Sequence, residues 1–251
     1  MRILITGSNG FIGSNLVRRL ESGNTCVLRT FNRGNSQHDL EHLVSEADTI
    51  CHLAGVNRPL NRAAFYENNT RLTEKLCDAI RLAHDVDGKI RTLVYSSSTH
   101  ISNKSEYGES KLRAFTAVQD LQEARRIVYH LPGVFGPGQR PFYNSVVATF
   151  CFSAVNNLPL TIVEGNKSLR LNFVADVVES MIENFSSTHN GILIAEVLPV
   201  YQTSVNELAN MISRIALEEI EGPHHAIGKR LEDRLRLTVQ WFLAQKLIPN
   251  G

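Results

Sequence analysis

Short apolar runs alternate with amphipathic segments through the first half of the chain. Five runs have the length and composition of buried strands, and they span residues 2–5, 26–31, 49–53, 91–95 and 126–131. Apolar residues recur at helical spacing in three longer segments, at residues 11–20, 61–84 and 110–124. Strands that alternate with helices are typical of an α/β fold with a doubly wound, mostly parallel sheet, and we expect this fold. Between the second and third runs there is room only for a helical fragment at 40–45, which predicts a short crossover.

The alternation weakens after Gly136. Helical spacing continues there in four segments, at residues 142–155, 174–185, 205–217 and 229–245, while residues 160–163 have an extended pattern. We therefore expect residues 1–135 to form the main domain. Residues 136–251 are expected to form mainly a smaller C-terminal lobe, partly interleaved with the main domain.

The chain is nearly neutral, with 26 Lys and Arg against 25 Asp and Glu among 251 residues. This balance gives no sign of an acidic partner such as nucleic acid. No apolar run approaches the roughly 20 residues of a membrane helix, and the first apolar segment is broken by the Gly7-Ser-Asn-Gly10 turn, unlike a signal peptide. We expect a cytoplasmic protein that binds neither nucleic acid nor membrane.

Cysteine and histidine spacing gives no metal site. The four cysteines are spread singly along the chain, as Cys26, Cys51, Cys77 and Cys151, and we interpret them as buried reduced thiols. His224 and His225 are the only adjacent histidine pair, and adjacent side chains on a helix or strand do not face the same way.

A Gly-x-x-Gly-x-x-Gly turn joins the first predicted strand to the first helix. Its first glycine permits a tight turn, its second lets the backbone approach a pyrophosphate, and its third allows close packing of helix on strand. The helix terminus adds positive potential for the phosphates. We predict a dinucleotide site of Rossmann type here, and the turn contributes Gly7, Asn9, Gly10, Phe11, Ile12 and Gly13.

The residues after the second strand bear on the choice of cofactor. That position holds Asn32-Arg33-Gly34 and no acidic residue that would bind a ribose 2′-hydroxyl. The forked, permanently charged Arg33 guanidinium suits a 2′-phosphate, so we favour NADPH over NAD. The alternative for Arg33 is a solvated loop charge.

Tyr107 and Lys111 form a Tyr-x-x-x-Lys pair that follows the serine run Ser96-Ser97-Ser98. Residues four apart on a helix share a face, so the ammonium is expected to lower the pKa of the phenol toward the working range. A phenol of that kind serves as an acid or base, and a serine at the mouth of the strand can hold a substrate oxygen.

These motifs together resemble the extended short-chain dehydrogenase/reductase family of nucleotide-sugar epimerases, dehydratases and reductases. The resemblance rests on GSNGFIG at 7–13, HLAGVNRP at 52–59, YSSS at 95–98, YGESK at 107–111 and LPGVFGPG at 131–138. It implies that Tyr107 is the proton donor or acceptor, that Lys111 is its partner and holds the nicotinamide ribose, and that Ser98 orients the substrate. It also implies further cofactor-lining residues, namely Leu53, Ala54, Gly55, Asn69, Ser97, Pro132 and Val134.

A narrower resemblance is to the reductase domain of bifunctional enzymes that make UDP-activated 2-acetamido-2,6-dideoxy-L-hexoses, precursors of N-acetyl-L-fucosamine. It rests on AGVNRP, SSS, YGESKL and residues 143–152. Those enzymes carry a C-terminal cupin domain, which we do not expect here because the sequence stops at Gly251. The sequence departs from the family's late segment at two positions. Ala175 replaces the first Asp of that segment, and Arg170 does not lie at the usual position of its arginine. We interpret Asp176 as a helix N-cap rather than a catalytic base.

The resemblance implies reduction of the C4 ketone of a UDP-linked 4-keto-6-deoxy amino sugar by NADPH, for capsule or O-antigen precursors. Within the substrate-binding lobe, Asn144 is a candidate for the uridine or pyrophosphate and is otherwise a helix cap. Arg58 is a candidate for the diphosphate and is otherwise a surface arginine. The alternatives are an epimerase or dehydratase that retains NAD and a non-catalytic NADPH-binding protein.

A homodimer is also implied, through the helices at 61–84 and 110–124. Four apolar residues on these helices either form that contact or face the sheet, namely Leu72, Leu76, Leu112 and Phe115.

Overall fold

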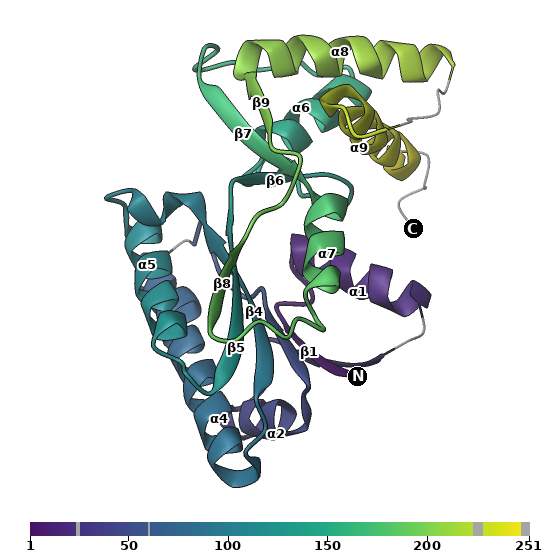
Figure 1. The fold of residues 1–251 in the computed structure, drawn as a ribbon. Coiled ribbons are helices and arrows are strands. Elements are labelled where there is room, and N and C mark those ends of the chain that lie inside the picture. The colour runs from purple at the N-terminus through teal and green to yellow at the C-terminus, as the bar shows by residue number, and fades with distance from the viewer. Residues whose placement is uncertain (24–25, 60, 223–227, 247–251) are drawn as a thin grey trace. The chain divides into compact units, whose positions relative to one another are not determined.

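The computed structural model describes residues 1–23, 26–59, 61–222 and 228–246. The chain forms two compact units (Figure 1). The first unit contains Met1–Leu131 and Val178–Val197, and the second contains Pro132–Val177 and Leu198–Gly251. The first unit is therefore built from two separate stretches of sequence.

A six-stranded parallel sheet forms the centre of the first unit, in the order β2-β1-β3-β4-β5-β8. Its strands are β1 (Arg2–Thr6), β2 (Val27–Phe31), β3 (Thr49–His52), β4 (Arg91–Ser98), β5 (Ala124–Leu131) and β8 (Ile192–Ala195). The order reverses between β1 and β3, and in such sheets ligands bind beyond the carboxyl ends of the strands at that point. The predicted doubly wound α/β fold of Rossmann type is confirmed.

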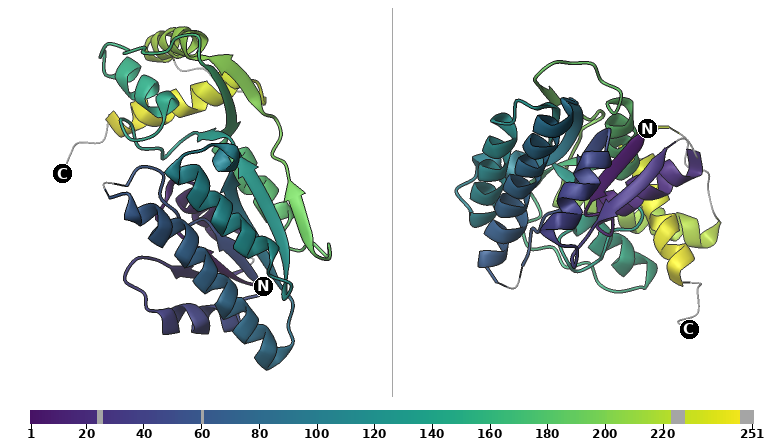
Figure 2. Two further views of the ribbon diagram at one scale, coloured as in Figure 1. Left: turned by 90° about the vertical axis from the view of Figure 1, so that its left-hand side faces the viewer. Right: turned by 90° about the horizontal axis from the view of Figure 1, so that it is seen from below.

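Helices cover both faces of this sheet. One face carries α2 (Gln37–Glu46), α4 (Leu72–Asp87) and α5 (Glu106–Gln119), whose apolar residues share one core with the strands. Helices α4 and α5 run side by side on this face (Figure 2). The opposite face carries α1 (Phe11–Gly23) and the part of α7 (Val174–Glu183) from Val178 onward (Figure 1), and the Arg19–Glu179 ion pair joins these two helices.

The helix predicted at 61–84 is continuous but not regular. A short α3 (Ala63–Phe65) leads into a π-helix (Tyr66–Arg71), which continues as α4. The wider π turn is a common feature of functional sites, and here it carries Asn69 and Thr70, both buried.

Two other helices start at earlier residues than those predicted from the sequence. Helix α5 begins at Glu106 because Ser105 caps it by accepting a hydrogen bond from the Gly108 N–H. Helix α2 is longer than the predicted 40–45 fragment because Ser36 and Asp39 form a capping box at its start.

The second unit packs three strands with helices α6 (Val146–Val155), α8 (Val205–Glu221) and α9 (Leu231–Lys246) around its own core. The strands are β6 (Gly133–Phe135), β7 (Ser168–Phe173) and β9 (Tyr201–Ser204). Strand β7 is central, pairing parallel with β6 and antiparallel with β9. The extended segment predicted at 160–163 is wrong: it forms no strand, and Val163 is 87% exposed.

The structure corrects two further predictions for this unit. Helix α6 starts at Val146 rather than Phe142, because Phe142 has a left-handed φ of 56° and Ser145 is the N-cap. Asp176 is not an N-cap: it lies in the first turn of α7 and forms an ion pair with Arg234 of α9 at 2.6 Å.

Buried free thiols are found at Cys51, Cys77 and Cys151, whereas Cys26 is only half-buried. Burial raises the pKa of the Cys77 thiol to about 12. In the described part of the chain, no helix combines the length and apolar character needed to cross a membrane, and no three potential metal ligands cluster together.

Candidate active site

The turn between β1 and α1 requires glycine at two points. Gly7 has a positive φ of 75°, and a Cβ there would lie 2.7 Å from the backbone of Ala54. A Cβ on Gly13 would lie 2.2 Å from the Gly7 carbonyl oxygen. The first turn of α1 contains no acidic residue. This bare turn at a helix N-terminus fits the pyrophosphate of a dinucleotide.

Beside this turn lies the end of β2. The Gly7 N–H donates to the Phe31 carbonyl at 3.2 Å, and the Ser8 hydroxyl donates to the Asn32 side chain at 3.0 Å. Arg33 follows in an exposed turn. The nearest downstream acid, Asp39, is held in the capping box of α2, where hydrogen bonds from Ser36 lower the pKa of its carboxyl.

Asn69 holds the segment after β3 in place. Its side-chain oxygen accepts from the Val56 N–H at 2.7 Å, and its amide donates to the Val56 carbonyl and to the Ser110 hydroxyl, each at 2.9 Å. A Cβ on Gly55 would lie 3.0 Å from the Asn69 oxygen. Asn69 is buried, and both hydrogens of its amide are used within the protein. It therefore holds in place the segment that contains the predicted cofactor-lining residues Ala54 and Gly55.

A buried histidine ties the sheet to α4. The His52 ring bridges the Thr6 and Thr73 hydroxyls at 2.7 and 2.8 Å and stacks on Tyr95. Burial, with a smaller effect of Lys111, lowers the pKa of His52 to about 3, so the ring stays neutral. Sequence reasoning missed this residue because neither threonine is near it in the sequence.

Tyr107 lies in the first turn of α5, at the carboxyl end of β4. The adjacent Gly108 lets the connecting loop approach, since a Cβ there would lie 2.3 Å from the Asn103 carbonyl oxygen and 2.5 Å from that of His100. The Tyr107 ring contacts the rings of Phe65 and His100. The spacing motif did not reveal this requirement for Gly108.

Ser98 is buried at the end of β4. Its oxygen accepts a hydrogen bond from the His100 N–H at 3.1 Å, which leaves the hydroxyl hydrogen for another partner. Burial raises the pKa of Tyr107, and a hydrogen bond with Ser98 lowers it in part. The structure thus brings together Ser98 and Tyr107.

Lys111 is buried one turn further along α5. Its ammonium donates to the Ser96 carbonyl at 2.7 Å and lies 4.8 Å from the centre of the Tyr95 ring. Burial lowers its pKa to about 8. The expected lowering of the Tyr107 pKa by Lys111 is wrong for this structure: the ammonium is directed at Ser96 and Tyr95, and burial raises the pKa of Tyr107 instead.

The other predicted residues lie on several elements. Ser97 is buried on β4, and Leu53 and Arg58 lie in the segment after β3, where Arg58 is exposed. The remaining three lie in the second unit, namely Pro132, Val134 and Asn144. Asn144 is exposed directly before Ser145, so the helix-cap alternative for it is wrong.

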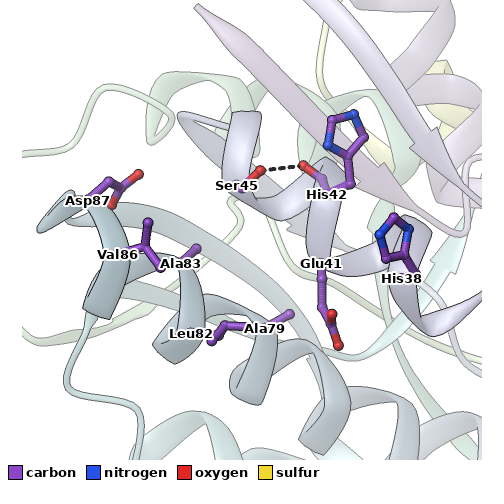
Figure 3. Close-up of a pocket in the computed structure, with 9 residues that line it drawn as sticks. All are labelled: His38, Glu41, His42, Ser45, Ala79, Leu82, Ala83, Val86 and Asp87. Carbon is purple, nitrogen blue, oxygen red and sulfur yellow. Dashed lines mark hydrogen bonds between the residues drawn. The ribbon is translucent and has the colours of Figure 1, made fainter.

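A groove of about 280 Å³ lies elsewhere in the first unit, between α2 and α4 (Figure 3). Its lining includes His38, His42 and Val86. The groove runs along α2 from His38 to Ser45 and along the C-terminal half of α4. It contains none of the predicted site residues.

A parallel sheet with a glycine turn after its first strand and a tyrosine–lysine helix beside its fourth defines a Rossmann-type dinucleotide-binding fold. The sequence model of the NAD dependent epimerase/dehydratase family matches residues 3–191. The chain belongs to this family.

Several known proteins are similar to this chain in sequence or in structure. The chain is 36% identical over 248 residues to a UDP-2-acetamido-2,6-beta-L-arabino-hexul-4-ose reductase of Pseudomonas aeruginosa, covering 98% of this chain and 66% of that protein. It is 26% identical to UDP-glucuronic acid decarboxylase 4 of Arabidopsis thaliana, covering 76% of this chain and 52% of that protein. The capsular polysaccharide assembling protein CapF of Staphylococcus aureus is similar in structure, with a TM-score of 0.80 and 26% identity, covering 100% of this chain and 67% of CapF. The chain therefore spans less than two thirds of both curated relatives.

Proposed function

We propose that the protein uses NADPH to reduce the C4 ketone of a UDP-linked 4-keto-6-deoxy amino sugar in the synthesis of capsule or O-antigen precursors. The observation that carries this proposal is the placement of the buried Ser98 close enough to Tyr107 to act on its pKa, with the buried Lys111 one turn further along α5. The sequence similarity to the Pseudomonas reductase supports the substrate class.

The roles of the three residues follow from their surroundings. With NADPH bound, the chemistry available to the site would be hydride transfer to the carbonyl carbon. Tyr107 donates its phenolic proton to the carbonyl oxygen, and the Ser98 hydroxyl holds that oxygen in place. Lys111 holds the nicotinamide ribose.

The direction of the Tyr107 pKa shift is compatible with reduction. A phenol whose pKa is raised by burial keeps its proton at neutral pH. A reductase needs this protonated form at the start of each turnover, because the phenol acts as an acid. An enzyme that begins by oxidising a sugar hydroxyl needs the deprotonated form instead.

The choice of NADPH rests on Arg33. Its guanidinium is exposed beside the glycine turn, and Asp39 is occupied in its capping box. We expect Arg33→Ser to weaken NADPH binding by about tenfold or more, because a charge-assisted contact to the 2′-phosphate is lost. NADH binding is expected to stay unchanged. Fluorescence titration checks both, with Arg29→Ser on the exposed face of β2 as the matched control; equal weakening for both cofactors would contradict the role.

A second candidate is a nucleotide-sugar epimerase or dehydratase that retains its NAD, and the similarity to UDP-glucuronic acid decarboxylases supports a UDP-sugar substrate for this candidate as well. Purified protein should be denatured and its supernatant examined for NAD. It should then be incubated with NADPH and a panel of UDP-4-keto sugars while NADPH absorbance is followed. Net NADPH consumption with an empty supernatant supports the reductase, whereas retained NAD without net consumption supports the second candidate.

We also propose a cytoplasmic homodimer. Of the four apolar residues considered for the contact, Leu76 is fully buried, Leu72 and Phe115 pack against the core, and Leu112 is 45% exposed. Leu112 is therefore the residue of this set that is best placed for a contact. Light scattering of the wild type and of Leu112→Glu tests this.

A further inference from the structure

Lys111 is a buried cation that has no carboxylate partner among the described residues. Its ammonium donates a hydrogen bond to the Ser96 carbonyl at 2.7 Å and lies over the Tyr95 ring, 4.8 Å from the ring centre. Lysine is almost never fully buried without a pairing group, because the loss of water disfavours its charged form. In the described structure, one carbonyl and one ring face therefore replace water around this charge.

Tyr95 meets the ammonium with the face of its ring. An aromatic face carries partial negative charge, and it attracts a cation within about 6 Å most strongly where water is excluded. Tyr95 is only 1% exposed. Burial raises the pKa of its phenol, so the phenol stays neutral, and the attraction comes from the ring rather than from a phenolate.

His52 packs against the Tyr95 ring from the neighbouring strand. The two residues are opposite each other in the parallel register of β3 and β4, and their rings stack with an interplanar angle of 19°. The Thr73 hydroxyl donates to the Asn69 carbonyl at 2.6 Å and therefore accepts from Nε2 of His52. This leaves Nδ1 to accept from the Thr6 hydroxyl. The imidazole is thus held as a neutral ring, which supports Tyr95 and adds no repelling charge beside the ammonium.

Three other titratable groups lie near Lys111, namely Tyr107 four residues earlier on α5, His52 on β3 and His130 on β5. Burial raises the pKa of Tyr107. Burial is also the first cause, and the charge of Lys111 the second, of the lowered pKa of both histidines. All three groups are neutral at physiological pH, so they offer the ammonium no opposite charge.

We propose that Tyr95 is a positioning residue for Lys111, and that its ring face keeps the ammonium charged and in place where no carboxylate does so. The inference rests on the proposed reductase function and deepens it, because the charged form of Lys111 is the one that holds the nicotinamide ribose. A carboxylate would bind the ammonium in a strong, directed ion pair and compete with the ribose hydroxyls. The ring attracts the charge without such an acceptor.

The first experiment needs neither cofactor nor substrate. The pKa of Lys111 is measured by NMR in protein with carbon-13-labelled lysine, and Lys111→Met identifies its signals. We expect Tyr95→Leu to lower this pKa by about one unit, because an attraction that favours the charged form is lost. Tyr95→Phe keeps the ring face and should leave the pKa unchanged.

The direction of the shift separates this role from packing alone. A cavity that only loosened the core would admit water and raise the Lys111 pKa toward its ordinary value. Tyr129 gives the matched control, since it is also buried but lies opposite Ser96 in the register and so points to the other face of the sheet. Tyr129→Leu should leave the Lys111 pKa unchanged. A raised or unchanged pKa in Tyr95→Leu, or an equal fall in Tyr129→Leu, would overturn the proposal.

A second series of variants keeps the core filled and decides the question even if Tyr95→Leu does not fold. The attraction depends on the negative face of the ring, and fluorine substituents weaken it while they change the shape of the ring little. The Lys111 pKa should fall in the order Tyr95→Phe, Tyr95→fluorophenylalanine, Tyr95→trifluorophenylalanine. The same pKa in all three variants would overturn the proposal.

The pH dependence of turnover tests the same role in the working enzyme. A pKa of Lys111 that is lower by about one unit reduces the charged fraction about fivefold at pH 8 and hardly at all at pH 6. With NADPH and the panel of UDP-4-keto sugars, kcat/KM of Tyr95→Leu relative to wild type should therefore be about fivefold lower at pH 8 than at pH 6. Tyr95→Phe should follow the wild type.

The outcomes distinguish the role of Tyr95 from the activity itself. An equal loss of kcat/KM at pH 6 and pH 8 in Tyr95→Leu means that Tyr95 is only structural and rejects the proposal. If the wild type reduces no ketone of the panel, the reductase function fails, and the NMR measurements still decide whether the Tyr95 ring keeps Lys111 charged.

Discussion

At the scale of single residues, the account depends on a phenol that keeps its proton. Burial raises the pKa of Tyr107, and the Ser98 hydrogen bond opposes this shift only in part. Tyr107→Phe removes the proton donor and leaves the ring contacts with Phe65 and His100 possible. We expect turnover to fall by about 10²- to 10⁴-fold, with NADPH affinity nearly unchanged. Steady-state kinetics and fluorescence titration check this, with the exposed Tyr66→Phe as control; full activity in Tyr107→Phe would reject the role.

The burial of Lys111 sets an upper limit to the pH range of cofactor binding and turnover. Burial lowers its pKa from the ordinary value of 10.5 to about 8, so the ammonium is lost as the pH rises through about 8. We expect NADPH affinity and kcat/KM to fall there, because the amine holds the ribose less well. The folded protein binds protons less tightly than the unfolded chain at this site, so its contribution to stability increases with pH between these two values.

A pH profile checks the assignment of this limit. Lys111→Arg keeps its charge at high pH and should remove the fall above pH 8 even if its overall rate is lower. The same descending limb in wild type and Lys111→Arg would assign the limit to another group.

Residue types and spacing predicted part of this site. Tyr107, Lys111 and Ser98 follow from a spacing rule and a serine run, and the structure places them at the ends of neighbouring elements. The direction of the shift in the Tyr107 pKa could not be predicted from the sequence. Residue spacing says nothing about burial, or about the Ser96 carbonyl that accepts the hydrogen bond from the Lys111 ammonium. The requirement for Gly108 could not be found either, since the close approach of the Asn103 and His100 carbonyls exists only in the folded structure.

At the scale of elements, the π turn before α4 supports the cofactor side of the site. Asn69 is buried in this turn and makes three hydrogen bonds from it. We expect Asn69→Ala to lower the free energy of unfolding by about 2 kcal/mol, because the Val56 backbone groups lose their partner. NADPH affinity should fall as well, since Ala54 and Gly55 lose their support. Urea denaturation and titration measure both.

The neighbouring asparagine gives the matched control for that prediction. Asn68 makes one hydrogen bond, to the Ala64 carbonyl within the same helical segment, so Asn68→Ala should cost less than about 1 kcal/mol and leave affinity unchanged. Similar results for the two variants would mean that Asn69 has no special supporting role.

Four of the five predicted strands, β1, β3, β4 and β5, are mostly buried. Strand β2 was predicted from its apolar residues although most of its positions are exposed. Strand β8 was missed because its residues are mostly half-exposed at the edge of the sheet. Strand β6 has only three residues. Strand β7 has the sequence SLRLNF, whose polar residues obscure the strand pattern. It is recognised as a strand only from its pairing with β6 and β9.

At the scale of the whole molecule, a neutral chain is compatible with anionic ligands. The net charge of +1 gives no long-range attraction, but the N-terminus of α1, Arg33 and Lys111 provide positive charge locally. The family model spans residues 3–191 and so includes strands of both units. The ligand roles of Pro132, Val134 and Asn144 in the second unit stay predictions.

The most direct test follows the hydride itself. The protein is incubated with NADPH that carries deuterium at the transferred position and with a UDP-linked 4-keto-6-deoxy amino sugar, and the product is examined by mass spectrometry and NMR. The account predicts one deuterium at C4 of the reduced sugar and one NADPH consumed for each sugar formed. Product formed without deuterium at C4, or turnover without net consumption of NADPH, would contradict it.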